Sequence, residues 1–188
     1  MRHNIPFRIV VQPNIYIHLV VMLFVFPLTW VVAWSVAIVF HELGHYFAIK
    51  IFKGKIDLVE IGFGGFRIQC SLLDEWKNVV SILCGPLCGF ALVLIGKWFP
   101  KVAVCSCILS IYNILPIFPL DGGRVLQILM GNNLFYKGIE KTVLLILFFG
   151  ALYCCFFLHL GVIPVLFVMA LWNSYRKIPC KDSVYKVQ

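Results

Sequence analysis

The sequence predicts an all-α polytopic membrane protein with six transmembrane helices, a short membrane-associated β-hairpin-like loop and an unwound fourth span. The composition is the first reason: of 188 residues, 62% are hydrophobic and only 13% are charged. Soluble domains are about 45–50% apolar and about 25% charged. A chain of this length has too little interior to bury so much apolar surface. A soluble globular protein is therefore excluded, and the apolar runs recur at the length of a membrane span.

The first two spans lie in one long uncharged block. Residues 9–41 contain no Lys, Arg, Asp or Glu. A transmembrane helix needs about 20 residues, so this block and its continuation to residue 52 fit two helices, over residues 9–26 and 28–52, with a tight turn near Pro27. No small-residue cleavage site follows the basic N-terminal residues, so we expect the first segment to stay as an anchor.

Residues 53–77 hold eight charged side chains and are expected to form a loop. Within it, residues 59–68 mix strand-like apolar residues with three glycines. One interpretation is a flexible hairpin that lies on the lipid headgroups. The other is a loop that dips into the protein and offers a strand edge to an extended peptide. Such backbone is tolerated at membrane depth only where protein or water covers it.

Four further spans are predicted along the rest of the chain. The third covers residues 79–99, and the fourth covers residues 102–120. A polar stretch over residues 121–141 follows. Residues 142–174 are long enough for two spans if both are short or tilted, with a break near residues 159–161.

The basic residues predict the orientation of these spans. Six spans place both termini on one side of the membrane, and that side then carries 14 Lys and Arg residues against only Lys97 and Lys101 on the other. Cytosolic loops carry an excess of Lys and Arg, so we predict a multi-pass protein of a bacterial cell membrane with both termini in the cytosol. The net charge of +8 then reflects topology and attraction to anionic membrane lipids, and nucleic acid is not an expected partner.

The second span contains an HExxH motif, His41-Glu42-Leu43-Gly44-His45. Positions i and i+4 lie on one face of a helix, so the two imidazoles can bind one zinc ion while Glu42 reaches a water on the metal. The alternative is a pair of histidines that hydrogen-bond between helices. It leaves Glu42 unexplained, because an ionisable group in a span costs about 2.5 kcal/mol or more. The motif would place the metal inside the bilayer, nearer its cytosolic side.

A zinc centre needs at least one more protein ligand and an open position. Asp121 is the other carboxylate that directly adjoins an apolar span. Pro116 and Pro119 before it disrupt a helix, and Gly122 and Gly123 after it let the chain turn. A helix unwound at membrane depth should line a cavity, so Asp121 is the candidate third ligand. The alternative is an aspartate that caps a helix end at the surface. The eight cysteines lack a paired CxxC spacing, which favours apolar packing over metal binding.

Two motifs together carry a family resemblance. HELGH in an early span and the segment NILPIFPLDGG, which ends at Gly123, in a later one resemble the site-2 protease family of intramembrane zinc metalloproteases. The sequences GFGG at residues 62–65 and Gly85-Pro86 also match, and the resemblance covers residues 10–178.

The resemblance implies a set of roles for named residues. One zinc ion would bind to His41, His45 and Asp121. Glu42 would be the catalytic base, and Asn113 would help to hold the substrate or the developing oxyanion. The expected activity is that of a zinc metalloendopeptidase.

The short chain is similar to the branch of stage IV sporulation protein FB, which processes a membrane-associated sigma-factor precursor in spore-forming bacteria. This likeness implies a membrane-associated protein substrate and regulatory membrane proteins as partners. About a dozen residues follow the sixth predicted span, so we expect residues 1–188 to form a single membrane-embedded metalloprotease domain without a PDZ or CBS module. The oligomeric state does not follow from the sequence.

Two other functions are compatible with the same motifs. A metal-transporting or metal-binding membrane protein with this His/His/Asp site would need a polar pathway through both leaflets, whereas the intramembrane charges cluster at one level. An inactive scaffold that binds membrane partners would have no need for Glu42. The sequence therefore favours hydrolysis of a peptide bond near the cytosolic leaflet.

Overall fold

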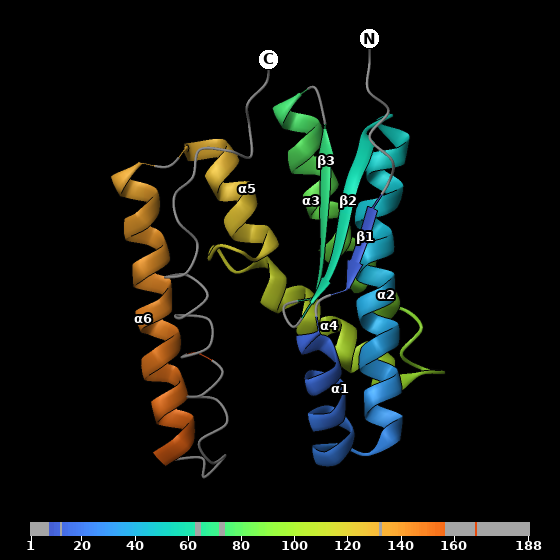
Figure 1. Cartoon of the computed structure of the whole chain (residues 1–188). Helices are drawn as coiled ribbons and strands as arrows, with labels where there is room; N and C mark the ends of the chain where they lie inside the picture. The colour runs from blue at the N-terminus through green and yellow to red at the C-terminus, as the bar shows by residue number, and fades with distance from the viewer. Residues whose placement is uncertain are drawn as a thin grey trace. The chain divides into compact units, whose positions relative to one another are not determined.

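The computed structural model describes residues 8–11, 13–62, 65–71, 74–131, 133–156 and 168. Over these residues the chain is mostly helical, with six helices and one small sheet (Figure 1). Contacts divide it into two compact units, Met1–Ile114 and Leu115–Gln188. The mostly helical fold class is confirmed, and the sixth predicted span lies outside the described residues except for Val168.

Within the described part of the chain, helices α2 (Leu28–Ile51) and α3 (Glu75–Val93) are the two that are long and apolar enough to cross a membrane by length and composition. The predicted second span agrees with α2 to within one residue. Helix α3 starts four residues before the start of the predicted third span and ends before the end of that span. Helix α4 is a shorter apolar helix. The four helices of the first unit are α1 (Asn14–Val25), α2 (Leu28–Ile51), α3 (Glu75–Val93) and α4 (Pro100–Ile114).

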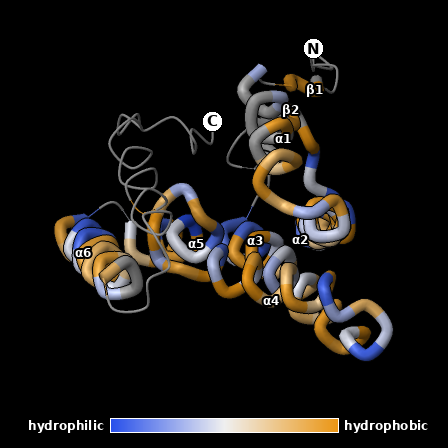
Figure 2. The backbone as a smooth tube through the Cα atoms, turned by 90° about the horizontal axis from the view of Figure 1, so that it is seen from below, coloured by the Kyte–Doolittle hydropathy of each residue, from blue (hydrophilic) through white to orange (hydrophobic). Residues whose placement is uncertain are grey.

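Small residues let α2, α3 and α4 contact one another closely. A Cβ atom on Gly44 of α2 would come within 2.4 Å of the Cys84 carbonyl oxygen on α3. Between α3 and α4, the Ser106 hydroxyl donates to the Gly89 carbonyl at 2.8 Å. Small residues of this kind are typical of helix interfaces in membranes. Figure 2 shows that apolar residues run along all three helices.

The loop predicted over residues 53–77 contains an antiparallel hairpin. Strands β2 (Lys55–Gly62) and β3 (Gly65–Ser71) pair along their length, with a bulge between Ile56 and Leu58. A third strand, β1 (Arg8–Val11), pairs in parallel with the other edge of β2. The sheet order is therefore β1-β2-β3.

Strand β1 corrects the first predicted span. We expected one helix over residues 9–26, but helix begins only at Asn14 and has 12 residues, about 18 Å at 1.5 Å per residue. Pro13 is the reason, because the residue before a proline disfavours helical backbone. The β-branched run Ile9-Val10-Val11 then favours a strand.

In the second unit, residues 115–120 are non-helical, and the peptide between Phe118 and Pro119 is cis. Helices α5 (Asp121–Met130) and α6 (Leu134–Phe156) follow. Two prolines lie in the non-helical segment, consistent with the loss of helical hydrogen bonds there. The position of this segment at membrane depth stays a prediction.

The polar stretch 121–141 is another correction, because it is largely helical rather than a loop. Helix α5 ends at Met130, and Gly131 follows with a φ of +68° that suits glycine. Helix α6 starts directly after Asn133. The side-chain oxygen of Asn133 accepts a hydrogen bond from the Tyr136 backbone amide at 2.8 Å. The charged residues of this stretch lie on the two helices α5 and α6, so a high density of charge did not indicate a loop here.

Candidate metal centre

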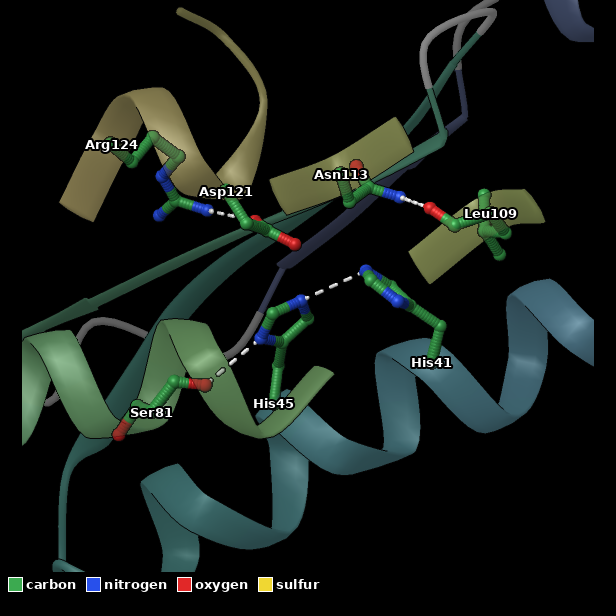
Figure 3. Close-up of polar contacts among 7 residues, drawn as sticks. All are labelled: His41, His45, Ser81, Leu109, Asn113, Asp121 and Arg124. Atoms are coloured by element: carbon green, nitrogen blue, oxygen red, sulfur yellow. Dashed lines mark hydrogen bonds and ion pairs between the residues drawn. The ribbon is translucent and has the colours of Figure 1, made fainter. Parts of the chain in front are cut away.

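The two histidines of the HExxH motif lie together on the buried face of α2. His41 is 3% exposed and His45 is 8% exposed. Their ring centroids are 4.9 Å apart with an interplanar angle of 83°, and 3.2 Å separates their Nε2 atoms (Figure 3). The helical spacing thus brings one nitrogen of each ring to the same point, as predicted from i and i+4.

Helix α3 orients the ring of His45. The distance from His45 Nδ1 to the Ser81 carbonyl oxygen is 2.9 Å. A carbonyl oxygen only accepts hydrogen bonds, so Nδ1 carries the proton and donates it. In the neutral ring Nε2 then keeps its lone pair, on the side of His41. Backbone carbonyls commonly fix metal-binding histidines in this way.

The absence of a side chain at Gly85 makes room for the same ring. A Cβ atom on Gly85 would lie 2.2 Å from His45 Nε2 and 2.3 Å from its Cε1, distances that real contacts do not reach. Pro86 follows inside α3 and is fully buried. The Gly85-Pro86 match of the sequence therefore corresponds to the surface against which His45 packs.

Asp121 is the first residue of α5 and is 6% exposed. A carboxylate at a helix N-terminus interacts favourably with the positive end of the helix dipole. One turn later, Arg124 Nη1 lies 3.6 Å from Asp121 Oδ1. The helix end and this guanidinium both place positive charge beside Asp121, and a carboxylate oxygen is one of the ligands that zinc binds.

His41, His45 and Asp121 together could hold a metal ion. All three are buried, and one ligand atom from each lies within 4.8 Å of the others. Two imidazole nitrogens and one carboxylate oxygen are the donor set of many catalytic zinc sites, which keep a fourth position open. The described cysteines Cys84, Cys88, Cys105 and Cys107 are free thiols, and none belongs to this group.

Glu42 and Asn113 lie outside that group of three. Glu42 is half-buried on α2 between the two histidines. Asn113 is half-buried near the end of α4, and its Nδ2 donates to the Leu109 carbonyl at 3.0 Å. Their catalytic roles stay predictions.

Sequence reasoning missed two of the residues that orient the ligands. Ser81 acts through its backbone carbonyl, which leaves no trace in residue type. The sequence analysis used Arg124 only as one of the 14 basic residues that predict the cytosolic side. Its i+3 spacing from Asp121 could have identified the ion pair.

Comparisons with known proteins agree with this chemistry. The model of peptidase family M50 matches residues 96–155, a region that includes Asn113 and Asp121 but not the HExxH motif. The zinc metalloprotease MJ0392 of Methanocaldococcus jannaschii is 27% identical to the chain, over 78% of this chain and 52% of that protein. The chain thus spans about half the length of this curated relative.

The fold has a counterpart of known structure. A site-2 protease from Methanocaldococcus jannaschii superposes with a TM-score of 0.64 at 19% identity, covering 99% of this chain and 98% of that chain. This likeness shows a shared fold. The His/His/Asp group shows separately that three side chains of this chain could hold a metal ion. The chain is thus similar to peptidase family M50 over residues 96–155, to an archaeal zinc metalloprotease in sequence and to a site-2 protease in fold.

Proposed function

We propose that the protein is an intramembrane zinc metalloprotease that hydrolyses a peptide bond of a membrane-associated protein near the cytosolic leaflet. The observation that carries this proposal is the buried group of His41, His45 and Asp121, whose donor atoms suit one zinc ion. Zinc bound there would supply Lewis acidity for peptide hydrolysis. The proposal treats residues 1–188 as one catalytic domain.

Two residues of the chain have proposed roles in the reaction. Glu42, next to His41 on α2, takes a proton from the attacking water and later gives it to the leaving amine. Asn113 helps to hold the substrate or the developing oxyanion, because its side-chain amide has a second N–H that can donate. Its present bond to Leu109 uses Nδ2 within its own helix.

The substrate has to be extended at the bond that is cleaved, because helical backbone groups are already bonded to one another. The sheet supports a way to stabilise such a segment. Strand β3 is at one end of the order β1-β2-β3 and pairs only with β2 among the described strands. An extended peptide that adds to its outer edge would satisfy its own backbone donors and acceptors.

The compact layout and the charge pattern support a narrower proposal about place and substrate. Fourteen basic residues against two favour a multi-pass bacterial membrane protein with both termini in the cytosol. The proposed substrate is a membrane-tethered transcription-factor precursor, in particular a sigma-factor precursor of sporulation. Membrane lipids and regulatory membrane proteins are the other proposed partners.

Co-expression with candidate membrane-tethered transcription-factor precursors tests the activity. We expect the wild type to cleave a substrate that Glu42→Gln leaves intact, while both proteins insert and retain zinc. Glu75→Gln, at the exposed start of α3, is the matched control and should cleave normally. Equal cleavage by the wild type and by Glu42→Gln would contradict the proposed mechanism.

A further inference from the structure

We propose that Glu140 of α6 is a positioning residue for the metal centre. Its buried carboxylate holds the non-helical segment 115–120 and thereby fixes the start of α5, where Asp121 lies. This inference rests on the proposed function, because it assigns Glu140 a task only if Asp121 binds zinc. Glu140 itself is not a member of the His/His/Asp group.

Glu140 is a buried hydrogen-bond acceptor and does not lie on the surface. It is 2% exposed, and Tyr136, one turn earlier on α6, is 3% exposed. The Tyr136 hydroxyl donates to Glu140 Oε1. The Phe118 amide donates to the same oxygen at 2.8 Å. A carboxylate is costly to bury without such donors, so its presence here indicates a specific partner.

That partner is the backbone of the non-helical segment. Pro116 and Pro119 have no N–H, so few donors are available to organise these residues. The segment makes two turn bonds of its own, from Ile117 to Leu115 at 2.8 Å and from Leu120 to Ile117 at 2.9 Å. The Phe118 amide points to Glu140 instead. Without that oxygen a part-buried N–H would lose its acceptor, which destabilises this conformation of the segment.

Helix α5 packs against the same peptide from another side. A Cβ atom on Gly123 would lie 2.2 Å from the Ile117 carbonyl carbon and 2.4 Å from the Phe118 nitrogen. The Tyr136 hydroxyl oxygen also lies 3.4 Å from the Gly123 carbonyl oxygen. The peptide between Ile117 and Phe118 is therefore held between α6 and the first turn of α5.

Asp121 lies two residues before Gly123 in that first turn. A shift of the peptide between Ile117 and Phe118 must consequently move the α5 start and the Asp121 carboxylate with it. Metal ligands need to be held within about 0.5 Å of their working geometry. Glu140 thus acts on the metal through backbone that it positions.

Zinc retention in the purified protein tests this inference without relying on catalysis. The zinc-loaded, monodisperse protein in detergent is challenged with a chelator, and the rate of zinc loss is measured. Glu140→Leu, which removes the acceptor, should lose zinc about tenfold faster than the wild type. Glu140→Gln keeps an acceptor oxygen for the Phe118 amide and should stay close to the wild type.

Two further variants keep the test decisive. Leu144→Ala removes a fully buried side chain one turn later on α6 and should retain zinc like the wild type in its folded fraction. If Glu140→Leu does not fold, Tyr136→Phe is compared with Tyr153→Phe, an exposed tyrosine on the same helix. Tyr136→Phe should lose zinc measurably faster than that control.

The outcomes separate this inference from the proposed function. A wild type that binds no zinc contradicts the proposed function itself. A zinc-retaining wild type with equal retention in Glu140→Leu overturns only the role of Glu140. Loss of zinc from Leu144→Ala as fast as from Glu140→Leu also overturns it, because general packing on α6 would then explain the effect. Where Tyr136→Phe replaces an unfolded Glu140→Leu, zinc loss equal to that of Tyr153→Phe overturns the inference.

Discussion

The proton on His45 is placed by a backbone group on a neighbouring helix. The Ser81 carbonyl accepts from Nδ1 at 2.9 Å, so Nε2 is the nitrogen of this ring that would bind a metal ion. The HExxH motif predicted the two histidines as metal ligands. The prolines that interrupt the fourth predicted span pointed to Asp121, the carboxylate beside them, as the third ligand. The contributions of Ser81 and Glu140 could not be predicted from the sequence. Ser81 acts through its backbone carbonyl, and Glu140 lies in the stretch 121–141 that was predicted as a polar loop.

Gly85→Ala tests how strictly the His45 ring is confined. The new methyl group would lie 2.2 Å from His45 Nε2, so the ring must rotate away from the Ser81 carbonyl or α3 must shift. We expect the folded protein to bind zinc about 10–100-fold more weakly, measured by competition with a fluorescent chelator.

Gly138→Ala is the matched control for this change. A Cβ atom there meets nothing within 4 Å, and alanine is favoured over glycine in a helix by about 0.5–1 kcal/mol. This variant should bind zinc like the wild type and be at least as stable. Normal zinc affinity in Gly85→Ala would show that the ring does not depend on this surface.

The elements of the fold were predicted unevenly, for physical reasons. Helix α2 was located to within one residue, because a long apolar run between Pro27 and a charged loop has clear ends. Strand β1 was missed, because its pairing with β2 is a contact between segments far apart in the sequence. Helix α5 was missed, because its first residues, Asp121, Gly122 and Gly123, are of types common in loops. Its first turn is stabilised by packing that the sequence does not show.

Gly44→Ala tests the close approach of α2 and α3. The added methyl would come within 2.4 Å of the Cys84 carbonyl oxygen and 2.8 Å of Cys88 Cβ. Overpacking of this kind typically costs about 1–3 kcal/mol, so we expect a lower unfolding temperature in detergent. Gly150→Ala on α6, where a Cβ atom meets nothing within 4 Å, should not lower it. Unchanged stability in Gly44→Ala would mean that the two helices can separate at no cost.

Strand β3 is the element proposed to bind the extended substrate. A photo-crosslinking residue at Phe66, which pairs with Ile61 in the sheet, should crosslink to a substrate trapped by Glu42→Gln. The same residue at Trp98, in the exposed turn before α4, is the control and should give no such product. Complete absence of crosslinks from Phe66, with the substrate bound, would rule out strand addition at this edge.

Over the whole molecule, the distribution of charge predicts the orientation in the membrane. The net charge is +8, and in the predicted topology almost all basic residues lie on one side. Composition predicted a membrane protein, because 62% hydrophobic residues cannot be buried inside a chain this short. The ends of the spans could not be predicted equally well, because strands and short helices interrupt the apolar runs.

Reporter fusions test that orientation. A reporter that is active only in the cytosol should be active when fused to either terminus and inactive when inserted between Lys97 and Lys101. The physical reason is that segments rich in Lys and Arg are retained on the cytosolic side of the membrane. Activity at only one terminus would require an odd number of spans.

Zinc content is the most direct test of the metal centre. The wild type purified in detergent should contain one zinc ion per chain, and Asp121→Ala should insert into the membrane normally but lose the metal. Asp74→Ala, which removes a carboxylate outside the group of three, is the matched control and is expected to retain zinc. A wild type that stays metal-free despite ample zinc, or an Asp121→Ala protein with full zinc content, would contradict the assignment of His41, His45 and Asp121 as the ligands.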